Sequence, residues 1–168
     1  MRFRALALGI LLFGGAAEAQ VRVDEFGFLE RWQILSEEVR LGQVQLDRWG
    51  MPPGYDTEVD KATEGGLFQV SVGPQQEPAP FNEIHTWLIR VKTPDGEPVT
   101  GADLKIYGGM PLHNHAFPTE PAITGEVAPG TYALEGVKFS MSGWWAIAMG
   151  ITAGDDTDIV SFNLVVLP

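Results

Sequence analysis

The sequence predicts an all-β protein, an immunoglobulin-like β-sandwich of about seven strands that follows a short N-terminal helix and a linker. Three observations predict this class. From Gly66 onward, apolar residues recur at every second position, which is the period of a strand with one buried face. The 168 residues include 20 glycines and 12 prolines, as expected for a chain with many turns. About seven alternating runs suit a sandwich or a barrel, and the pattern alone leaves both open.

Residues 1–19 predict a secretory signal peptide. Two arginines precede an apolar run, residues 5–16, that is too short to span a bilayer comfortably. The small residues of Ala17-Glu18-Ala19 predict cleavage before Gln20. We therefore expect an exported, soluble protein of a bacterial periplasm, with no membrane span after cleavage. An uncleaved N-terminal anchor is the alternative.

Residues 20–49 predict a helical segment. Its apolar residues fall at spacings of four, three and four, which places them on one stripe of a helix: Phe28, Trp32, Leu35 and Val39. Asp24 is suited to cap the start of this helix and Gly42 to end it. The aromatic rings must cover something, so the helix is expected to pack on the main domain or on a partner. Residues 50–65 are rich in turn formers and acids and predict a linker.

Residues 66–168 predict the sandwich domain. The residues that mark its strands are, in chain order, Phe68, Val70 and Val72; Trp87, Ile89 and Val91; Leu104 and Ile106; Ile123 to Val127; Tyr132 and Leu134; Trp145 to Ile151; and Phe162, Leu164 and Val166. Turn formers separate several of these runs, as in the segment 94–98. Met149 shares the face of Trp145 and is expected in the core.

The chain is acidic and contains no cysteine. Its formal net charge is -11, from 22 acidic and 11 basic residues. An acidic surface repels phosphate and attracts cations, so no nucleic-acid partner is expected. The lack of cysteine excludes disulfides, iron–sulfur clusters, thiolate zinc sites and blue-copper centres. The common motifs of hydrolases, zinc proteases and nucleotide-binding enzymes are missing as well, so an enzyme is not expected.

The segment Gly108-Gly109-Met110-Pro111-Leu112-His113-Asn114-His115 contains the strongest chemical signal. In an extended chain, His113 and His115 point to one face and lie about 6.5 to 7 Å apart, close enough for both imidazoles to bind one ion. Met110 adds a thioether. Imidazole with thioether, without thiolate, suits copper, and thioether favours Cu(I). The alternative is a surface loop whose histidines and methionine bind nothing.

Two further residues are candidates to complete this site. His85 shares the face of Trp87, so it is either a histidine at the edge of the core with a hydrogen-bonded ring or, if the strand begins later, a rim residue that reaches the loop. Met141 precedes a strand at a turn and is placed to approach the loop of Met110.

Four stretches resemble the YtkA-like or FixH-like domains of exported bacterial proteins. They are the run from Asn82 to Trp87, the turn 94–102, the element Gly109 to His115 with Pro118-Thr119, and the run from Gly136 to Met141 before Trp144. The resemblance covers about residues 66–167 and implies an immunoglobulin-type sandwich associated with copper handling or with assembly of copper oxidases. Transferred to this sequence, it implies the ligands His85, Met110, His113, His115 and Met141. Ala116 and Ser142 depart from the family pattern, which has glycine and proline there.

Two functions are therefore expected from different classes. The first is a periplasmic copper-binding protein that stores, shields or delivers copper through Met110, His113 and His115, with His85 or Met141 completing the ligands. The alternative is a non-catalytic accessory subunit of a membrane-associated complex. In that case Trp32 and Trp49, which are costly to expose, would anchor a protein partner.

Overall fold

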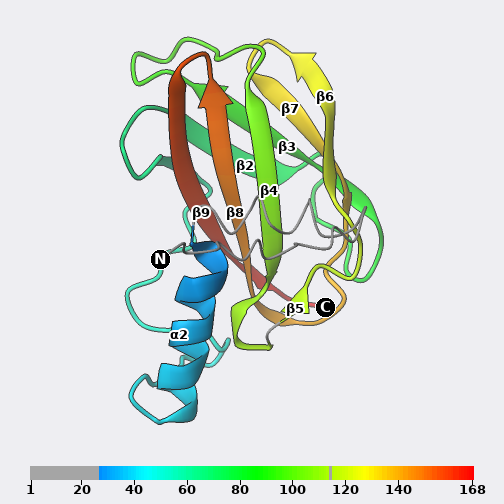
Figure 1. The fold of residues 1–168 in the computed structure, drawn as a ribbon. Helices are drawn as coiled ribbons and strands as arrows, with labels where there is room; N and C mark the ends of the chain where they lie inside the picture. Colours follow the sequence, from blue (N-terminus) through cyan, green and yellow to red (C-terminus); the bar gives the residue numbers. More distant parts are fainter. Residues whose placement is uncertain (1–26, 114) are drawn as a thin grey trace, which may run out of the picture.

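The structure is a computed structural model that describes residues 27–113 and 115–168. Within these residues the chain forms two antiparallel sheets and one α-helix, arranged as in Figure 1. The predicted signal peptide, its cleavage site and the proposed helix cap Asp24 lie outside the described residues. In the described part of the chain, no helix has the length and hydropathy needed to cross a bilayer.

The first sheet has five strands in the order β1-β2-β3-β7-β6. Their bounds are β1 Asp60–Ala62, β2 Gln69–Pro74, β3 His85–Lys92, β7 Thr131–Val137 and β6 Ala122–Ala128. The second sheet has four strands in the order β5-β4-β8-β9, with bounds β5 His115–Ala116, β4 Asp103–Met110, β8 Gly143–Ala153 and β9 Asp156–Val166. The predicted immunoglobulin-like β-sandwich is confirmed, and the seven runs of alternating residues correspond to its seven longer strands.

The core lies between the two sheets. The alternation in β3 buries Trp87, Ile89 and Val91, and the same cluster includes Trp145 from β8 and Phe162 from β9. Apolar side chains on the inner faces of both sheets are thereby removed from water, which is the main driving force for the sandwich. Met149, expected in the core, is 1% exposed.

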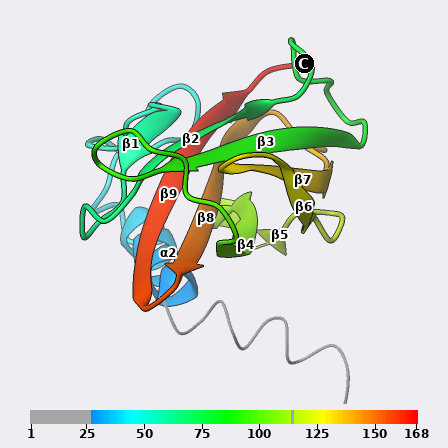
Figure 2. The ribbon, with the colours of Figure 1, turned by 90° about the horizontal axis from the view of Figure 1, so that it is seen from above.

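Helix α2, Phe28–Arg40, covers the outer face of the second sheet. In Figure 2 it lies on the side of β8 and β9 that faces away from β2 and β3. Phe28 is buried against Ala148 of β8, and the ring of Trp32 lies 5.0 Å from that of Tyr107 in β4, measured between centroids. After Arg40 the chain reaches Gly42, whose positive φ ends the helix. The aromatic stripe predicted from the sequence thus packs on the main domain.

The stretch 50–65, expected as a linker, is partly built into the sandwich. The ring of Tyr55 lies 5.3 Å from that of Trp144, and the side-chain amide of Asn163 donates to the carbonyl of Asp56 at 3.0 Å. Residues 60–62 form β1, which pairs with the start of β2. These contacts join positions far apart in the sequence, and for this reason the stretch lacks any local periodicity.

Asp158 fastens the end of this stretch to β9. Its buried carboxylate accepts hydrogen bonds from the Thr63 hydroxyl at 2.5 Å and from the main-chain N–H groups of Gly65 and Leu67 at 2.9 to 3.1 Å. Burial alone would raise the pKa of Asp158, but these bonds and one from the Ile159 N–H together lower it below the ordinary value. The carboxylate is therefore held in its charged form as a structural clamp.

Candidate functional site

The candidate site lies at the end of β4, where the chain turns back on itself. A short 3₁₀ turn, η1 Pro111–His113, follows β4, and β5 then pairs antiparallel with the strand that the chain has just left. Gly109 lies opposite Ala116 and Met110 lies opposite His115. The sequence predicted a loop in which the chain from His113 to His115 is extended. The structure instead places His113 in the 3₁₀ turn and only His115 in a strand, so the extended pair is not formed. It also extends β4 to Met110, so the thioether candidate belongs to a strand.

Two glycines allow this close approach. A Cβ at Gly108 would overlap the ring of Phe117, and one at Gly109 would overlap the main chain of His115 and Ala116. Neither glycine has a positive φ, so their requirement is one of space and not of backbone conformation. The pair of glycines thus lets β5 lie directly against β4.

The two histidines of the loop lie side by side on the surface. The ring centroids of His113 and His115 are 5.8 Å apart, and both side chains are exposed. Nδ1 of His115 lies 3.1 Å from the carbonyl of Ala116. If that nitrogen carries the proton and donates it, Nε2 keeps its lone pair for a metal. Asn114, between the two histidines, lies outside the described residues.

The two methionine candidates differ in exposure. Met110 is 2% exposed, and its methyl carbon lies 3.5 Å from the position a Cβ would take at Gly143. Met141 is 42% exposed and precedes Gly143 by two residues. Its carbonyl accepts a hydrogen bond of 2.9 Å from the indole of Trp145. Met110 is therefore buried inside the fold, whereas Met141 lies at its surface.

Aromatic rings form the floor beneath the histidines, and sequence reasoning did not assign them to the site. The ring of Trp145 lies 6.2 Å from that of His115 and stacks on Phe117 at 5.6 Å, with an angle of 18° between the planes. Trp145 is fully buried. The alternation of β8 correctly indicates a core position, but no sequence signal shows which loop covers it.

His85 is held apart from the other candidates. Its Nδ1 is 2.9 Å from the carbonyl of Glu83, and its Nε2 accepts a 2.9 Å hydrogen bond from the indole of Trp87. Both ring nitrogens are therefore engaged, as in the interpretation of His85 as a hydrogen-bonded histidine at the edge of the core. The ring packs on Phe139 at 5.6 Å, and Phe139 in turn packs on Trp145. These two rings stand between His85 and His115.

The candidate donors at this end of the sandwich are thus imidazoles and thioethers. Within residues 27–113 and 115–168, no three His, Cys, Asp or Glu side chains come close enough together to hold a metal ion. A site at this end of the sandwich would depend on the sulfur atoms of Met110 and Met141 to complete the set begun by His113 and His115. Hard cations, which need several oxygen ligands, find no such group there.

Comparison with known proteins finds similar solved structures. Two similar solved structures are a DUF4426 family protein from Pseudomonas aeruginosa and the ZirS C-terminal domain. The first is 16% identical over 66% of this chain and 96% of its own, with a TM-score of 0.49. The second is 17% identical over 61% of this chain and 68% of its own, with a TM-score of 0.38. No curated protein matches the sequence.

One family model matches the chain, that of YtkA-like proteins, over residues 70–150. This range begins in β2 and ends in β8, and it contains all five candidate ligands: His85, Met110, His113, His115 and Met141. Residues 70–150 are therefore similar to YtkA-like proteins.

Proposed function

We propose that the protein is an exported copper-binding protein that shields or delivers copper in the periplasm, with a role in binding and not in catalysis. His113, His115 and Met110 are the proposed ligands, and Met141 completes the set. The observation that carries this proposal is the pair of histidine rings, 5.8 Å apart, in which His115 also lies opposite Met110 in the pairing of β5 with β4.

The spacing of the two rings fits one ion. An ion about 2 Å from a nitrogen of each ring lies about 3 Å from each ring centroid, so two imidazoles on one ion have centroids at most about 6.5 Å apart. The separation of 5.8 Å lies within this limit. Imidazole accepts copper in both oxidation states, and thioether favours Cu(I), so this donor set suits copper better than a hard cation.

The exposure of the site favours exchange over permanent storage. His113, His115 and Met141 are all exposed, so a chelator or another protein can reach them. Met110 is buried and Trp145 lies beneath the histidines, so one side of the site is dry and fixed. An ion held this way can be passed on by replacing the outer ligands one at a time. The net charge of -11 adds a general attraction for cations without selecting among them.

Export and the association with copper also draw on the family resemblance. The YtkA-like match supports the domain, and the resemblance noted in the sequence implies copper handling for such domains. The FixH-like resemblance, the signal peptide and the periplasmic location remain part of this proposal. His85 is left out of the ligand set because both of its ring nitrogens already have partners.

Titration with copper tests the proposal. The purified chain should bind one Cu(I) under anaerobic conditions and one Cu(II) in air, with competition by a chelator giving the affinities. The double variant His113→Ala with His115→Ala should lose most Cu(II) affinity. Met110→Leu, which keeps the apolar volume, should weaken Cu(I) binding about tenfold or more.

Met149→Leu is the matched control, because Met149 is equally buried but lies deeper in the core of the same sheet, opposite Ile106 of β4. It should leave both affinities unchanged. A stoichiometry well below one, or copper binding unchanged in the double histidine variant, would refute the copper site.

The accessory-subunit alternative draws less support. Its motive was the cost of exposing tryptophans in the N-terminal segment, and Trp32 packs on Tyr107 while the Arg48 guanidinium lies over the Trp49 ring. Recovery of a membrane complex with the wild-type chain, lost when residues 20–60 are removed from a chain that still folds, would restore this alternative.

A further inference from the structure

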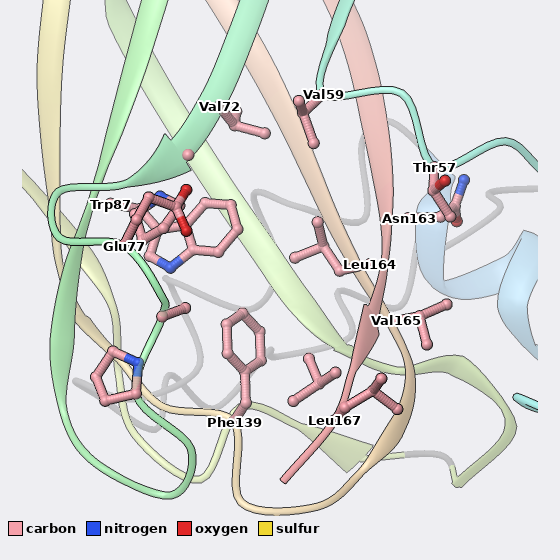
Figure 3. Close-up of a pocket in the computed structure, with 15 residues that line it drawn as sticks. Thr57, Val59, Val72, Glu77, Trp87, Phe139, Asn163, Leu164, Val165 and Leu167 are labelled. Atoms are coloured by element: carbon pink, nitrogen blue, oxygen red, sulfur yellow. The ribbon is translucent and has the colours of Figure 1, made fainter.

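A cleft lies on the open side of the sandwich, away from the candidate copper ligands, where the edges of β2 and β9 face each other. It is a cleft of about 320 Å³ with mostly apolar walls. Figure 3 shows Trp87 and Phe139 at its floor, with Val72 on the β2 side and Leu164 on the β9 side. The candidate copper ligands do not line it. The proposal below is therefore independent of copper.

The chain itself shows how an extended segment closes this seam. The carbonyl of Val59 accepts a 2.9 Å hydrogen bond from the N–H of Val72 in β2, and the N–H of Glu64 donates to the carbonyl of Ile159 in β9 at 2.8 Å. Residues 59–64 thus bridge the edges of both sheets. Residues 56 and 57 lie beside β9 as well, because the side-chain amide of Asn163 donates to the carbonyl of Asp56. Beyond that contact the same seam continues as the cleft.

The edge of β9 along the cleft has main-chain groups to offer. Within the described residues, β9 pairs only with β8, and its outer edge receives only the bond at Ile159. Because strand residues alternate in direction, the main-chain groups of Asn163 and Val165 face the same outer edge as those of Ile159. On β2 the equivalent position after Val72 is Pro74, which has no N–H. An added strand can therefore form main-chain hydrogen bonds with the outer edge of β9, whereas β2 has no N–H at Pro74 to donate to it.

The charge of the cleft limits what fits into it. Glu77 is the one charged residue among the described residues that line it. No lysine or arginine of the described chain lines the cleft. A basic side chain would therefore meet a complementary carboxylate, and the net charge of -11 draws basic partners to the molecule.

We propose that this cleft binds an extended segment of a partner protein, which adds to the free edge of β9 at Asn163 to Leu167. Alternate apolar side chains of the segment enter the cleft, and one lysine or arginine pairs with Glu77. Main-chain hydrogen bonds supply affinity and the cleft supplies selectivity, as in other cases of strand addition.

A synthetic peptide tests this proposal with the full chain. The probe is an acetylated and amidated octapeptide of alternating valine and threonine with a lysine at its centre. We expect binding in the micromolar to millimolar range, with amide chemical shifts changing chiefly at residues 163–167. The same peptide with N-methylated main-chain nitrogens on its hydrogen-bonding edge should bind at least about tenfold more weakly, because it cannot form the ladder.

Two variants examine the two halves of the site. Val165→Pro removes an edge N–H that has no partner in the sheet and should weaken the peptide at least about tenfold, whereas Val127→Pro on the free edge of β6 should not. Glu77→Gln should weaken binding of the lysine peptide, and Glu135→Gln, an exposed change on β7, should not. If either proline variant fails to fold, the comparison of Glu77→Gln with Glu135→Gln still tests the proposal.

The proposal fails if the lysine peptide does not bind at millimolar concentration, or if the N-methylated peptide binds equally well. It also fails if a simple alkylamine produces the same shifts with the same affinity, since the cleft would then be a small-molecule pocket. Dimerisation of the chain through β9 would show that the occupant is a second copy and would overturn the proposal too.

Discussion

Replacement of Asp158 should lower the stability of the fold, because this residue bonds to several positions at once. Its carboxylate holds Thr63, Gly65 and Leu67 against β9. In Asp158→Asn an amide N–H₂ group replaces one acceptor oxygen and faces donors. We expect a loss of about 2 to 3 kcal/mol in the free energy of unfolding, measured by urea denaturation. Asp155→Asn, in the exposed turn before β9, should change it by less than about 0.5 kcal/mol.

The same residue predicts a dependence of stability on pH. The pKa of Asp158 is lowered in the folded protein, so the unfolded chain takes up a proton more readily than the folded one. Its contribution is present above the unfolded pKa of about 4 and is lost as the pH falls below that value. The gap in stability between wild type and Asp158→Asn should therefore be largest above about pH 5 and shrink on acidification. A gap that is constant from pH 7 to 3 would contradict the role given to the charged carboxylate.

A substitution at His85 tests whether this histidine is structural or a metal ligand. In His85→Ala, the indole N–H of the buried Trp87 loses its acceptor, and we expect a cost of about 1 to 3 kcal/mol in the free energy of unfolding. The copper affinity of the folded variant should stay within about twofold of wild type, because the ring has no free nitrogen to offer. A much larger loss in the chelator competition would return His85 to the ligand set.

The sequence identified His113, His115 and Met110 as neighbours because all three lie within six residues. It placed the two histidines on one face of an extended chain and missed the 3₁₀ turn that contains His113. It could not show that Met110 is buried while Met141 is exposed, because that depends on how the turn before β8 packs against β4. It also left both readings of His85 open. Only the hydrogen bonds to Glu83 and Trp87 distinguish between them.

At the level of elements, the pairing of β5 with β4 places His115 opposite Met110. Gly109→Ala places a methyl group where the main chain of His115 and Ala116 lies, and a main chain cannot move aside as a flexible side chain can. We expect β5 to separate from β4. The loss in the free energy of copper binding should be larger than the loss in the free energy of unfolding. Chelator competition and thermal unfolding measure the two effects.

Gly73→Ala is the control for this substitution. Gly73 also lies in a strand, but a Cβ there meets nothing within 4 Å and its φ is not positive. It should leave copper affinity and melting temperature close to wild type. Equal copper affinity in Gly109→Ala would show that β5 is not needed for the site.

The seven long strands were predictable because each carries a period of two, whereas β1 and β5 were not. A strand of two or three residues has too few positions to show a period. Both short strands exist because a longer strand already offers an edge: β1 pairs with β2, and β5 pairs with β4. The helix was predicted from its apolar stripe, but the sequence did not show that it packs on the second sheet.

For the whole molecule, α2 forms a third layer that packs on the second sheet and contributes to the stability of the fold. Phe28 is 2% exposed, so Phe28→Ala should cost about 3 to 5 kcal/mol in the free energy of unfolding, whereas Ile34→Ala, at a residue 54% exposed, should cost less than about 0.5 kcal/mol. Chemical denaturation followed by tryptophan fluorescence and by circular dichroism provides the comparison. If the helix melted separately from the sheets, the two signals would give different midpoints.

The helix also touches the candidate site. The hydroxyl of Ser36 donates a 2.9 Å hydrogen bond to the carbonyl of Pro111, the first residue of η1. A residue of the N-terminal segment therefore helps to set the position of the loop that contains His113. Loss of the helix should consequently disturb the proposed copper site as well as the fold.

Strand β8 has side chains buried on both faces, because the core covers one face and the N-terminal segment covers much of the other. It also has a strand on each side, β4 and β9. Its amide hydrogens can therefore meet solvent deuterium only when whole layers separate. They should be the last in the chain to exchange, and their exchange rates should report the opening of the entire molecule.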